Sequence, residues 1–130
     1  MTTPARIMII DDEERIRQLL MDYPEDFEGF ALRASESAED ALRELEREPA
    51  DLCVVDMRLP GINGQAFILR ARERGLCERF ILHTGSMDFA LTQELQASGL
   101  TENDVFFKPC DMDQMLTRIR IILQLPGAGT

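Results

Sequence analysis

Four short apolar segments of the chain are each followed directly by side chains that could take part in phosphoryl chemistry. Asp11 and Asp12 follow the first segment, and Asp56 follows another. Thr84 follows a third apolar segment, and Lys108 follows a fourth. Three neighbouring carboxylates repel one another unless a cation lies among them, and oxygen ligands without histidine or cysteine favour Mg2+. A carboxylate beside such an ion can attack phosphorus, while an ammonium and a hydroxyl bind the transferred group.

The elements that must position these side chains follow from the alternation of two patterns. Short apolar runs of strand length cover residues 6–10, 30–34, 52–55, 80–83 and 105–107. The third run is apolar throughout, which is typical of a strand buried on both faces. Helical spacing of apolar residues recurs between the runs. We therefore predict an α/β domain of the (βα)5 type, with a doubly wound parallel sheet of five strands.

The helices are predicted around residues 16–23, 38–45, 63–75, 88–98 and 112–123, of which the fourth has the weakest pattern. Ser37 and Asp111 are the expected N-caps of the second and fifth helices. Gly75 is expected to end the third. Because the carboxyl ends of parallel strands share one edge of the sheet, the three carboxylates, Thr84 and Lys108 should meet there.

Length and composition are consistent with a single folded domain. The chain has 130 residues, of which 45% are hydrophobic and 29% charged, and this excludes a disordered or disulfide-stapled chain. We assign residues 1–125 to the domain and 126–130 to a flexible tail. The formal net charge of −10 argues against direct binding to nucleic acid and to anionic membrane surfaces, because both would repel so acidic a protein.

The cysteines and the N-terminus indicate a cytoplasmic protein. Cys53, Cys77 and Cys110 are odd in number and lack the spacing of a zinc site, so we interpret them as free thiols in a reducing compartment. The apolar run near the N-terminus is too short for a signal peptide, and no stretch approaches the length of a membrane span.

Four motifs together resemble the receiver domain of two-component response regulators, in particular its stand-alone, chemotaxis-type members. They are IIDDEE at 9–14, VVDMRLPG at 54–61 with Gly64, HTG at 83–85 and FKP at 107–109. The resemblance covers about residues 5–125 and implies the flavodoxin-like strand order 2-1-3-4-5. It also implies the roles of individual residues. Asp56 would be the phosphoacceptor, and Mg2+ would be bound by Asp11, Asp12, Asp56 and the backbone carbonyl of Arg58. Thr84 and Lys108 would bind the phosphoryl group and act in the switch.

The resemblance further implies a signalling function. Such a domain accepts a phosphoryl group from a histidine kinase or a phosphotransfer protein and then changes its affinity for partner proteins. It is not an enzyme beyond catalysing its own phosphorylation and dephosphorylation. Since no output domain follows in the sequence, we expect a downstream protein target or a role as phosphate carrier. We expect a monomer or a weak homodimer.

Departures from the family pattern leave two alternatives open. The family usually has an aromatic residue at the position of Val105, so Phe106 or Phe107 could be the aromatic of the switch region. This change gives weight to an interaction module that works without phosphate. An aspartate-nucleophile phosphatase is the second alternative, but those enzymes commonly have an aspartate where this chain has Arg58. His83 is the only histidine, and we interpret it as a packed residue rather than a catalytic base.

Overall fold

The computed structural model describes residues 4–22 and 29–123, so the predictions for residue 23 and for the tail at 126–130 lie outside the described residues. Five strands form one parallel sheet with the order β2-β1-β3-β4-β5. This confirms the predicted fold class and strand order. The strands are β1 (Ala5–Ile10), β2 (Phe30–Ser35), β3 (Leu52–Val55), β4 (Phe80–Thr84) and β5 (Val105–Phe107).

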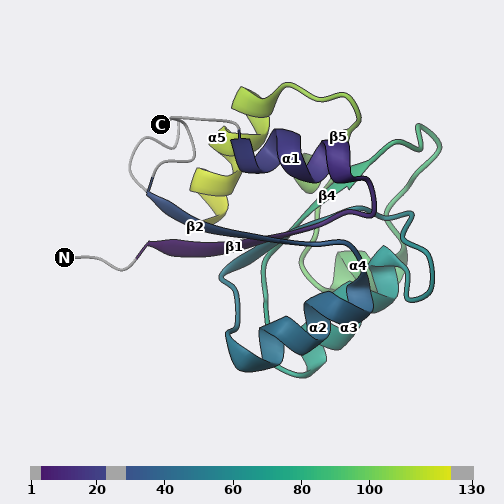
Figure 1. The fold of residues 1–130 in the computed structure, drawn as a ribbon. Helices are drawn as coiled ribbons and strands as arrows, with labels where there is room; N and C mark the ends of the chain where they lie inside the picture. The colour runs from purple at the N-terminus through teal and green to yellow at the C-terminus, as the bar shows by residue number, and fades with distance from the viewer. Residues whose placement is uncertain (1–3, 23–28, 124–130) are drawn as a thin grey trace.

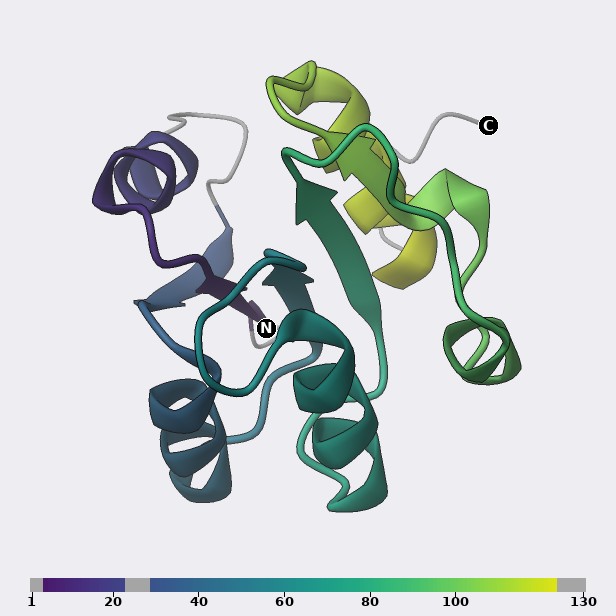
Figure 2. The ribbon, with the colours of Figure 1, turned by 90° about the vertical axis from the view of Figure 1, so that its right-hand side faces the viewer.

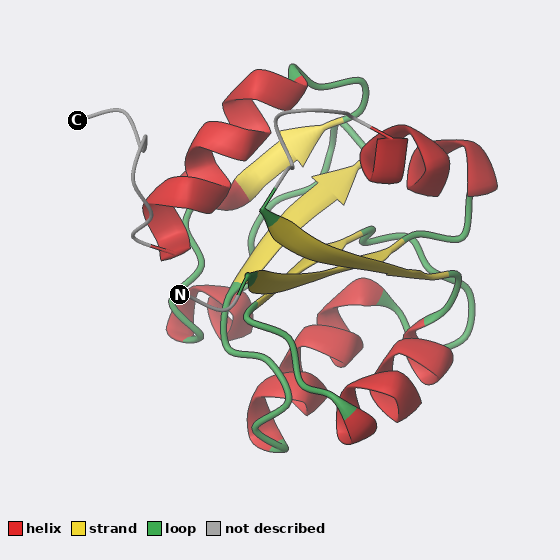
Figure 3. Cartoon of the chain, turned by 60° about the vertical axis from the view of Figure 1, so that its left-hand side comes forward, coloured by secondary structure: helices red, strands yellow, loops and turns green. Residues whose placement is uncertain are grey.

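Helices cover both faces of the sheet (Figure 1, Figure 2). On one face lie α1 (Glu14–Asp22) and α5 (Met112–Leu123). On the other lie α2 (Ala38–Arg47), α3 (Gly64–Glu73) and the short α4 (Gln93–Ala97). A 3-10 helix, η2 (Glu102–Asp104), leads into β5. Figure 3 shows the sheet enclosed between these two layers. Within the described residues, no helix combines the length and the apolar character needed to cross a membrane.

The core consists of two clusters of buried side chains, one on each face of the sheet. Along β1, Met8 and Ile10 face the cluster under α2, α3 and α4, whereas Ile7 and Ile9 face the cluster under α1 and α5. This alternation is the period of two that a pleated strand imposes. All four residues of β3 are buried, as expected for a central strand with helices on both faces.

Local signals in the sequence set most helix boundaries. The hydroxyl of Ser37 accepts a hydrogen bond from the backbone N–H of Asp40 at 3.1 Å, and this begins α2. Before α5, Asp111 Oδ1 accepts from the backbone N–H of Asp113 at 2.9 Å. Gly75 follows α3 with a φ of 70°, a conformation that favours glycine. The predicted caps and the predicted end of the third helix are therefore confirmed.

The helix predicted over residues 88–98 is wrong in its extent, because only Gln93–Ala97 are α-helical. Thr92 is the N-cap, and its hydroxyl accepts a hydrogen bond from the backbone N–H of Leu95 at 3.2 Å. The preceding Phe89 and Leu91 pack, partly buried, against the cluster under α2, α3 and α4 without forming a helical turn. The connection between β4 and β5 thus contains more loop than its apolar pattern predicts.

Candidate functional site

Three carboxylates meet at the carboxyl edge of the sheet. One oxygen from each of Asp11, Asp12 and Asp56 lies within 4.8 Å of the others. The ladder between β1 and β3 creates this proximity, because Ile10 pairs with Val55 and each strand is followed directly by an aspartate. Asp11 is 2% exposed and Asp56 is 4% exposed, whereas Asp12 is exposed to solvent. The structure therefore brings together the three carboxylates that the sequence placed at one edge.

Backbone N–H groups orient the two buried carboxylates. Asp11 Oδ1 accepts a hydrogen bond from the N–H of Glu13 at 2.9 Å, and Asp56 Oδ1 accepts from the N–H of Arg58 at 3.0 Å. Both contacts span two residues, as in the turns that aspartate favours. In addition, the guanidinium of Arg17 donates to the carbonyl of Asp11 at 2.8 Å. The second oxygen of each carboxylate lies near the ammonium of Lys108.

Lys108 places its ammonium among the carboxylates. Its Nζ donates to Asp11 Oδ2 at 2.7 Å and lies 3.6 Å from Asp56 Oδ2. The lysine follows β5, and its backbone N–H donates to the carbonyl of Thr84 at 2.7 Å. Pairing of β4 with β5 therefore carries this side chain across the edge of the sheet to residues far away in the sequence.

The site holds more negative charge than its own lysine neutralises. Burial raises the pKa of Asp11 although the hydrogen bond from Lys108 opposes the rise. Burial also raises the pKa of Asp56, with a further contribution from the negative charge of Asp11. Burial lowers the pKa of Lys108, but its hydrogen bond to Asp11 and the carboxylate charges outweigh this, and the net pKa is raised. A second cation beside the ammonium would relieve this imbalance.

An oxygen-only cluster of this charge suits Mg2+, which favours hard oxygen ligands. The described carboxylates fit that requirement, and the nearest permanent cation, Lys108, contacts Asp11 more closely than Asp56. The fourth predicted ligand, the backbone carbonyl of Arg58, follows Asp56 by two residues on the same loop. Its role stays a prediction.

Thr84 and the aromatic residues of β5 occupy defined positions beside the cluster. Thr84 ends β4 with a fully buried side chain, and its Oγ1 accepts from the backbone N–H of Ser86 at 3.2 Å. In the ladder Phe107 pairs with Thr84, whereas Phe106 pairs with His83. Phe106 packs against the cluster under α1 and α5, and Val105 packs on the opposite face. By strand alternation Phe107 shares the face of Thr84 and Val105.

Gly64 is a residue of the site that functional-group reasoning missed. A Cβ added there would lie 2.7 Å from the backbone oxygen of Asp56 and 2.7 Å from the Cα of Met57. Real Cβ atoms do not approach backbone this closely, so α3 can begin beside the loop of Asp56 only because Gly64 lacks a side chain. The glycine belongs to the motif at 54–64, but only its contacts explain it.

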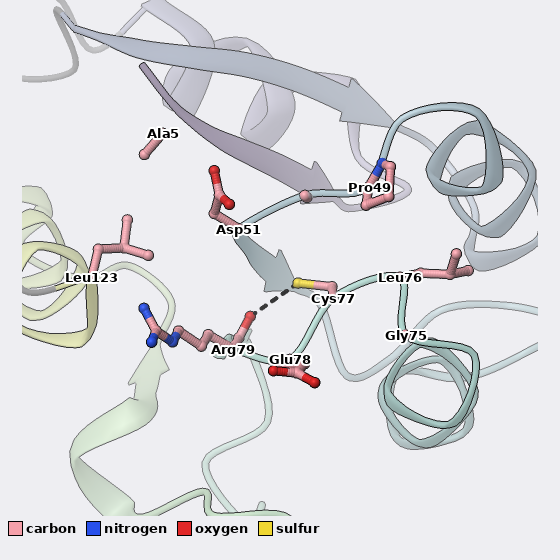
Figure 4. Close-up of a pocket in the computed structure, with 10 residues that line it drawn as sticks. Ala5, Pro49, Asp51, Gly75, Leu76, Cys77, Glu78, Arg79 and Leu123 are labelled. Atoms are coloured by element: carbon pink, nitrogen blue, oxygen red, sulfur yellow. Dashed lines mark hydrogen bonds between the residues drawn. The ribbon is translucent and has the colours of Figure 1, made fainter. Parts of the chain in front are cut away.

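A separate cavity of about 490 Å3 lies at the opposite edge of the sheet (Figure 4). It is lined by residues at the amino ends of strands, including Ala5, Asp51 and Arg79. Cys77 points toward Arg79 and donates from its thiol to the carbonyl there at 3.3 Å. None of the site residues predicted from the sequence lines this cavity. The candidate site is therefore the carboxylate cluster and not this hollow.

Comparison with known proteins identifies the family. The family model of the response regulator receiver domain matches residues 7–120. The chain belongs to this family. Among curated relatives, the transcriptional regulatory protein ResD of Bacillus subtilis is 26% identical over 95% of this chain and 50% of its own length. The transcriptional regulatory protein GltR of Pseudomonas aeruginosa is 30% identical over 91% of this chain and 48% of its own length. The chain thus spans about half the length of these relatives.

Solved structures with the same fold include receiver domains of known regulators. The chemotaxis response regulator CheY4 of Vibrio cholerae superposes with a TM-score of 0.75 at 19% identity, covering 92% of this chain and 99% of that one. The REC domain of AraT, a response regulator from Geobacillus stearothermophilus, gives a TM-score of 0.76 at 24% identity, covering 93% and 94%. At these identities the similarity establishes the fold of the receiver domain.

Proposed function

We propose that this receiver domain is a phosphorylatable switch that accepts a phosphoryl group on Asp56. The donor would be a phosphohistidine on a histidine kinase or a phosphotransfer protein. Mg2+ would be held by Asp11, Asp12, Asp56 and the carbonyl of Arg58. The observation that supports this proposal is the convergence of three carboxylates and one ammonium at a single edge of the sheet.

The transfer is a displacement at phosphorus. A carboxylate oxygen of Asp56 forms the new O–P bond while the N–P bond of the donor breaks, and the imidazole leaves with the electron pair. Arg58 restrains the nucleophile, because its N–H holds Oδ1 of Asp56. Mg2+, when bound, supplies positive charge to the phosphoryl oxygens. Lys108 lies 3.6 Å from Asp56 Oδ2, within reach of a phosphoryl group carried by that residue.

The switch would operate through Thr84 and the β4–β5 edge. A phosphoryl group on Asp56 carries about two negative charges at neutral pH, in place of the single charge of the carboxylate, and offers strong hydrogen-bond acceptors. Moving the Thr84 hydroxyl toward it would give up the hydrogen bond from Ser86, which Thr84 accepts at 3.2 Å. Of the two candidate aromatics, Phe107 is favoured for a switch role because it pairs with Thr84 and shares its face of the sheet. Phe106 packs on the opposite face, under α1 and α5.

The output would be a change in affinity for a protein partner. A partner that prefers one arrangement of the residues between Thr84 and β5 shifts the population of the two states by its differential affinity. Beyond its own phosphorylation and dephosphorylation we propose no enzymatic turnover. We propose a monomer or a weak homodimer for the isolated domain, located in the cytoplasm.

Intact mass measurement tests the phosphoacceptor. The protein is incubated with a small phosphodonor and Mg2+, and the expected product carries one additional phosphoryl group. Asp56→Asn should show no addition, and a chelator should prevent it in the wild type. Asp104→Asn provides a matched control, because Asp104 is equally buried but lies outside the carboxylate cluster. Equal labelling of wild type and Asp56→Asn would show that the assignment is wrong.

Val105 favours a second candidate, an interaction module that signals without phosphate. A small residue takes the position where the family usually has the aromatic ring of the switch, and it packs against the cluster under α2, α3 and α4. Partner affinity would then be the same with and without a beryllofluoride mimic of the phosphoryl group. A changed affinity would support the phosphorylatable switch instead.

A further inference from the structure

A histidine, a cysteine and a methionine converge beside the carboxylate cluster, on the face of the sheet covered by α1 and α5. Cys110 Sγ lies 3.7 Å from His83 Nε2 and 3.9 Å from Met112 Sδ. All three residues line one cavity of about 410 Å3, together with Ile16 and Leu19 of α1. We propose that His83, Cys110 and Met112 form a binding site for a soft monovalent metal ion of the Cu+ class.

The two donor-atom distances measured from Cys110 Sγ are compatible with a three-coordinate metal. With metal–sulfur bonds of about 2.3 Å and a metal–nitrogen bond of about 2.0 Å, a trigonal ion separates sulfur from nitrogen by about 3.7 Å. The same geometry separates two sulfurs by about 4.0 Å. The two edges that meet at Cys110, at 3.7 and 3.9 Å, agree with these values.

The histidine is buried without a full set of partners. His83 is 3% exposed, and among the described residues its Nδ1 has no hydrogen-bond partner. The nitrogen that faces Cys110 is Nε2, 3.7 Å from Sγ, and this is the atom that would bind the ion. Burial, with a smaller effect of the Lys108 charge, lowers the pKa of His83 to about 4. The ring is therefore neutral at physiological pH and offers a lone pair to a metal.

The ligand types select the class of ion. Thiolate and thioether sulfur are soft donors that favour Cu+, whereas Mg2+ and Ca2+ require oxygen ligands. Binding would deprotonate Cys110, with the proton released to solvent and the sulfur lone pair donated to the metal. A thiolate with a monovalent ion is neutral overall, so it adds no net charge to a cavity that Glu13, Arg15 and Lys108 also line. A divalent ion would leave a net positive charge beside Lys108, which lines the same cavity.

Access to the cavity is compatible with binding. Cys110 is partly exposed, while Met112 is 8% exposed and packs in the cluster under α1 and α5. Cys53 and Cys77 are buried on the other face of the sheet, under α2 and α3. A soft ion could also bind to one of these two thiols. Replacing them therefore controls for binding away from Cys110.

An anaerobic titration with Cu+, in competition with a chromogenic Cu+ chelator, tests the proposal. In a second experiment Ag+ replaces Cu+ as a redox-inert ion, and native mass spectrometry counts the bound ions. The wild type should bind one ion per chain, and X-ray absorption should show two sulfur neighbours and one nitrogen neighbour. Cys110→Ser should lose the ion. Met112→Leu preserves core volume but removes a ligand. It should weaken binding by about tenfold or more, because replacing a residue that only supports a ligand already weakens metal binding by about that factor.

Two control variants change a thiol and a thioether that lie outside the proposed site. Cys77→Ser retains a donor for the Arg79 carbonyl, and Met87→Leu changes a side chain that is 75% exposed. Both should bind Cu+ as the wild type does, and circular dichroism should show every variant folded. Unchanged binding by folded Cys110→Ser would overturn the proposal. Loss of binding in Cys77→Ser, or tighter binding of Zn2+ than of Cu+ by the wild type, would do the same.

Discussion

Replacing Asp56 by asparagine should stabilise the metal-free protein, although it removes the proposed nucleophile. The Asp56 carboxylate is 4% exposed, lies within 4.8 Å of the oxygens of Asp11 and Asp12, and is 3.6 Å from the Lys108 ammonium. At an effective dielectric constant of about 20, a single charge pair at these distances contributes about 3–5 kcal/mol. Attraction to Lys108 therefore offsets the repulsion from Asp11 but not the remaining terms.

Those remaining terms are the repulsion from Asp12, weakened by solvent, and the cost of burying a carboxylate. The raised pKa of Asp56, caused first by burial and then by the charge of Asp11, has the same sign. Asparagine keeps an acceptor for the N–H of Arg58 and removes the charge. We expect a gain of about 1–2 kcal/mol in the free energy of unfolding, or roughly 3–8 °C in Tm for a domain of this size.

Urea unfolding followed by circular dichroism, in the presence of a chelator, measures this gain. Asp104→Asn is the matched control, because Asp104 is also 4% exposed but accepts hydrogen bonds from Arg118 at 2.8 Å and from the backbone N–H of Thr101 at 2.9 Å. The same substitution should therefore destabilise the protein there, by about 1–3 kcal/mol. The opposite signs separate electrostatic repulsion from a general effect of replacing aspartate.

Adding Mg2+ should reduce the difference in the free energy of unfolding between Asp56→Asn and the wild type. An ion that binds only the folded protein stabilises it by about 1.4 kcal/mol at ten times its dissociation constant. The wild type should show this gain, and Asp56→Asn should show a smaller one because a ligand has lost its charge. If Asp56→Asn is less stable than the wild type in the chelator, then pairing with Lys108 outweighs repulsion and the reasoning is refuted.

Three further predictions concern the frame around the site. Lys108→Met should destabilise the protein by about 3 kcal/mol, because Asp11 would lose its buried partner; a urea titration that shows no loss would contradict this. Gly64→Ala should cost about 1–3 kcal/mol, since its Cβ would collide with the backbone of Asp56. Labelling by a phosphodonor should slow in the same variant, and an unchanged rate would mean that the loop is unaffected. Phe67→Ala removes a fully buried ring and should cost about 3–5 kcal/mol in thermal unfolding, without abolishing labelling of the folded fraction.

Much of the fold could be predicted from the sequence because the local spacing of apolar and capping residues determines most strands and helices. The uninterrupted apolar run of β3 and the caps at Ser37 and Asp111 act within a few residues, so they are visible in the sequence itself. The extent of α4 could not be predicted in this way. Leu91 and Leu95 have the i, i+4 spacing of a helix, but Leu91 packs against the core from a loop. Apolar spacing indicates burial, and burial does not require a helix.

The residue types of the site, and their places after strands, were determined by the sequence alone, since parallel strands bring their carboxyl ends to one edge. Tertiary structure decided which groups touch. Lys108 bonds to Asp11 across 97 positions, and His83 meets Cys110 across 27. Such contacts depend on strand pairing and on the direction of each side chain, which a linear pattern does not contain. The excess negative charge at Asp56 likewise follows from burial and distance, which only the folded chain defines.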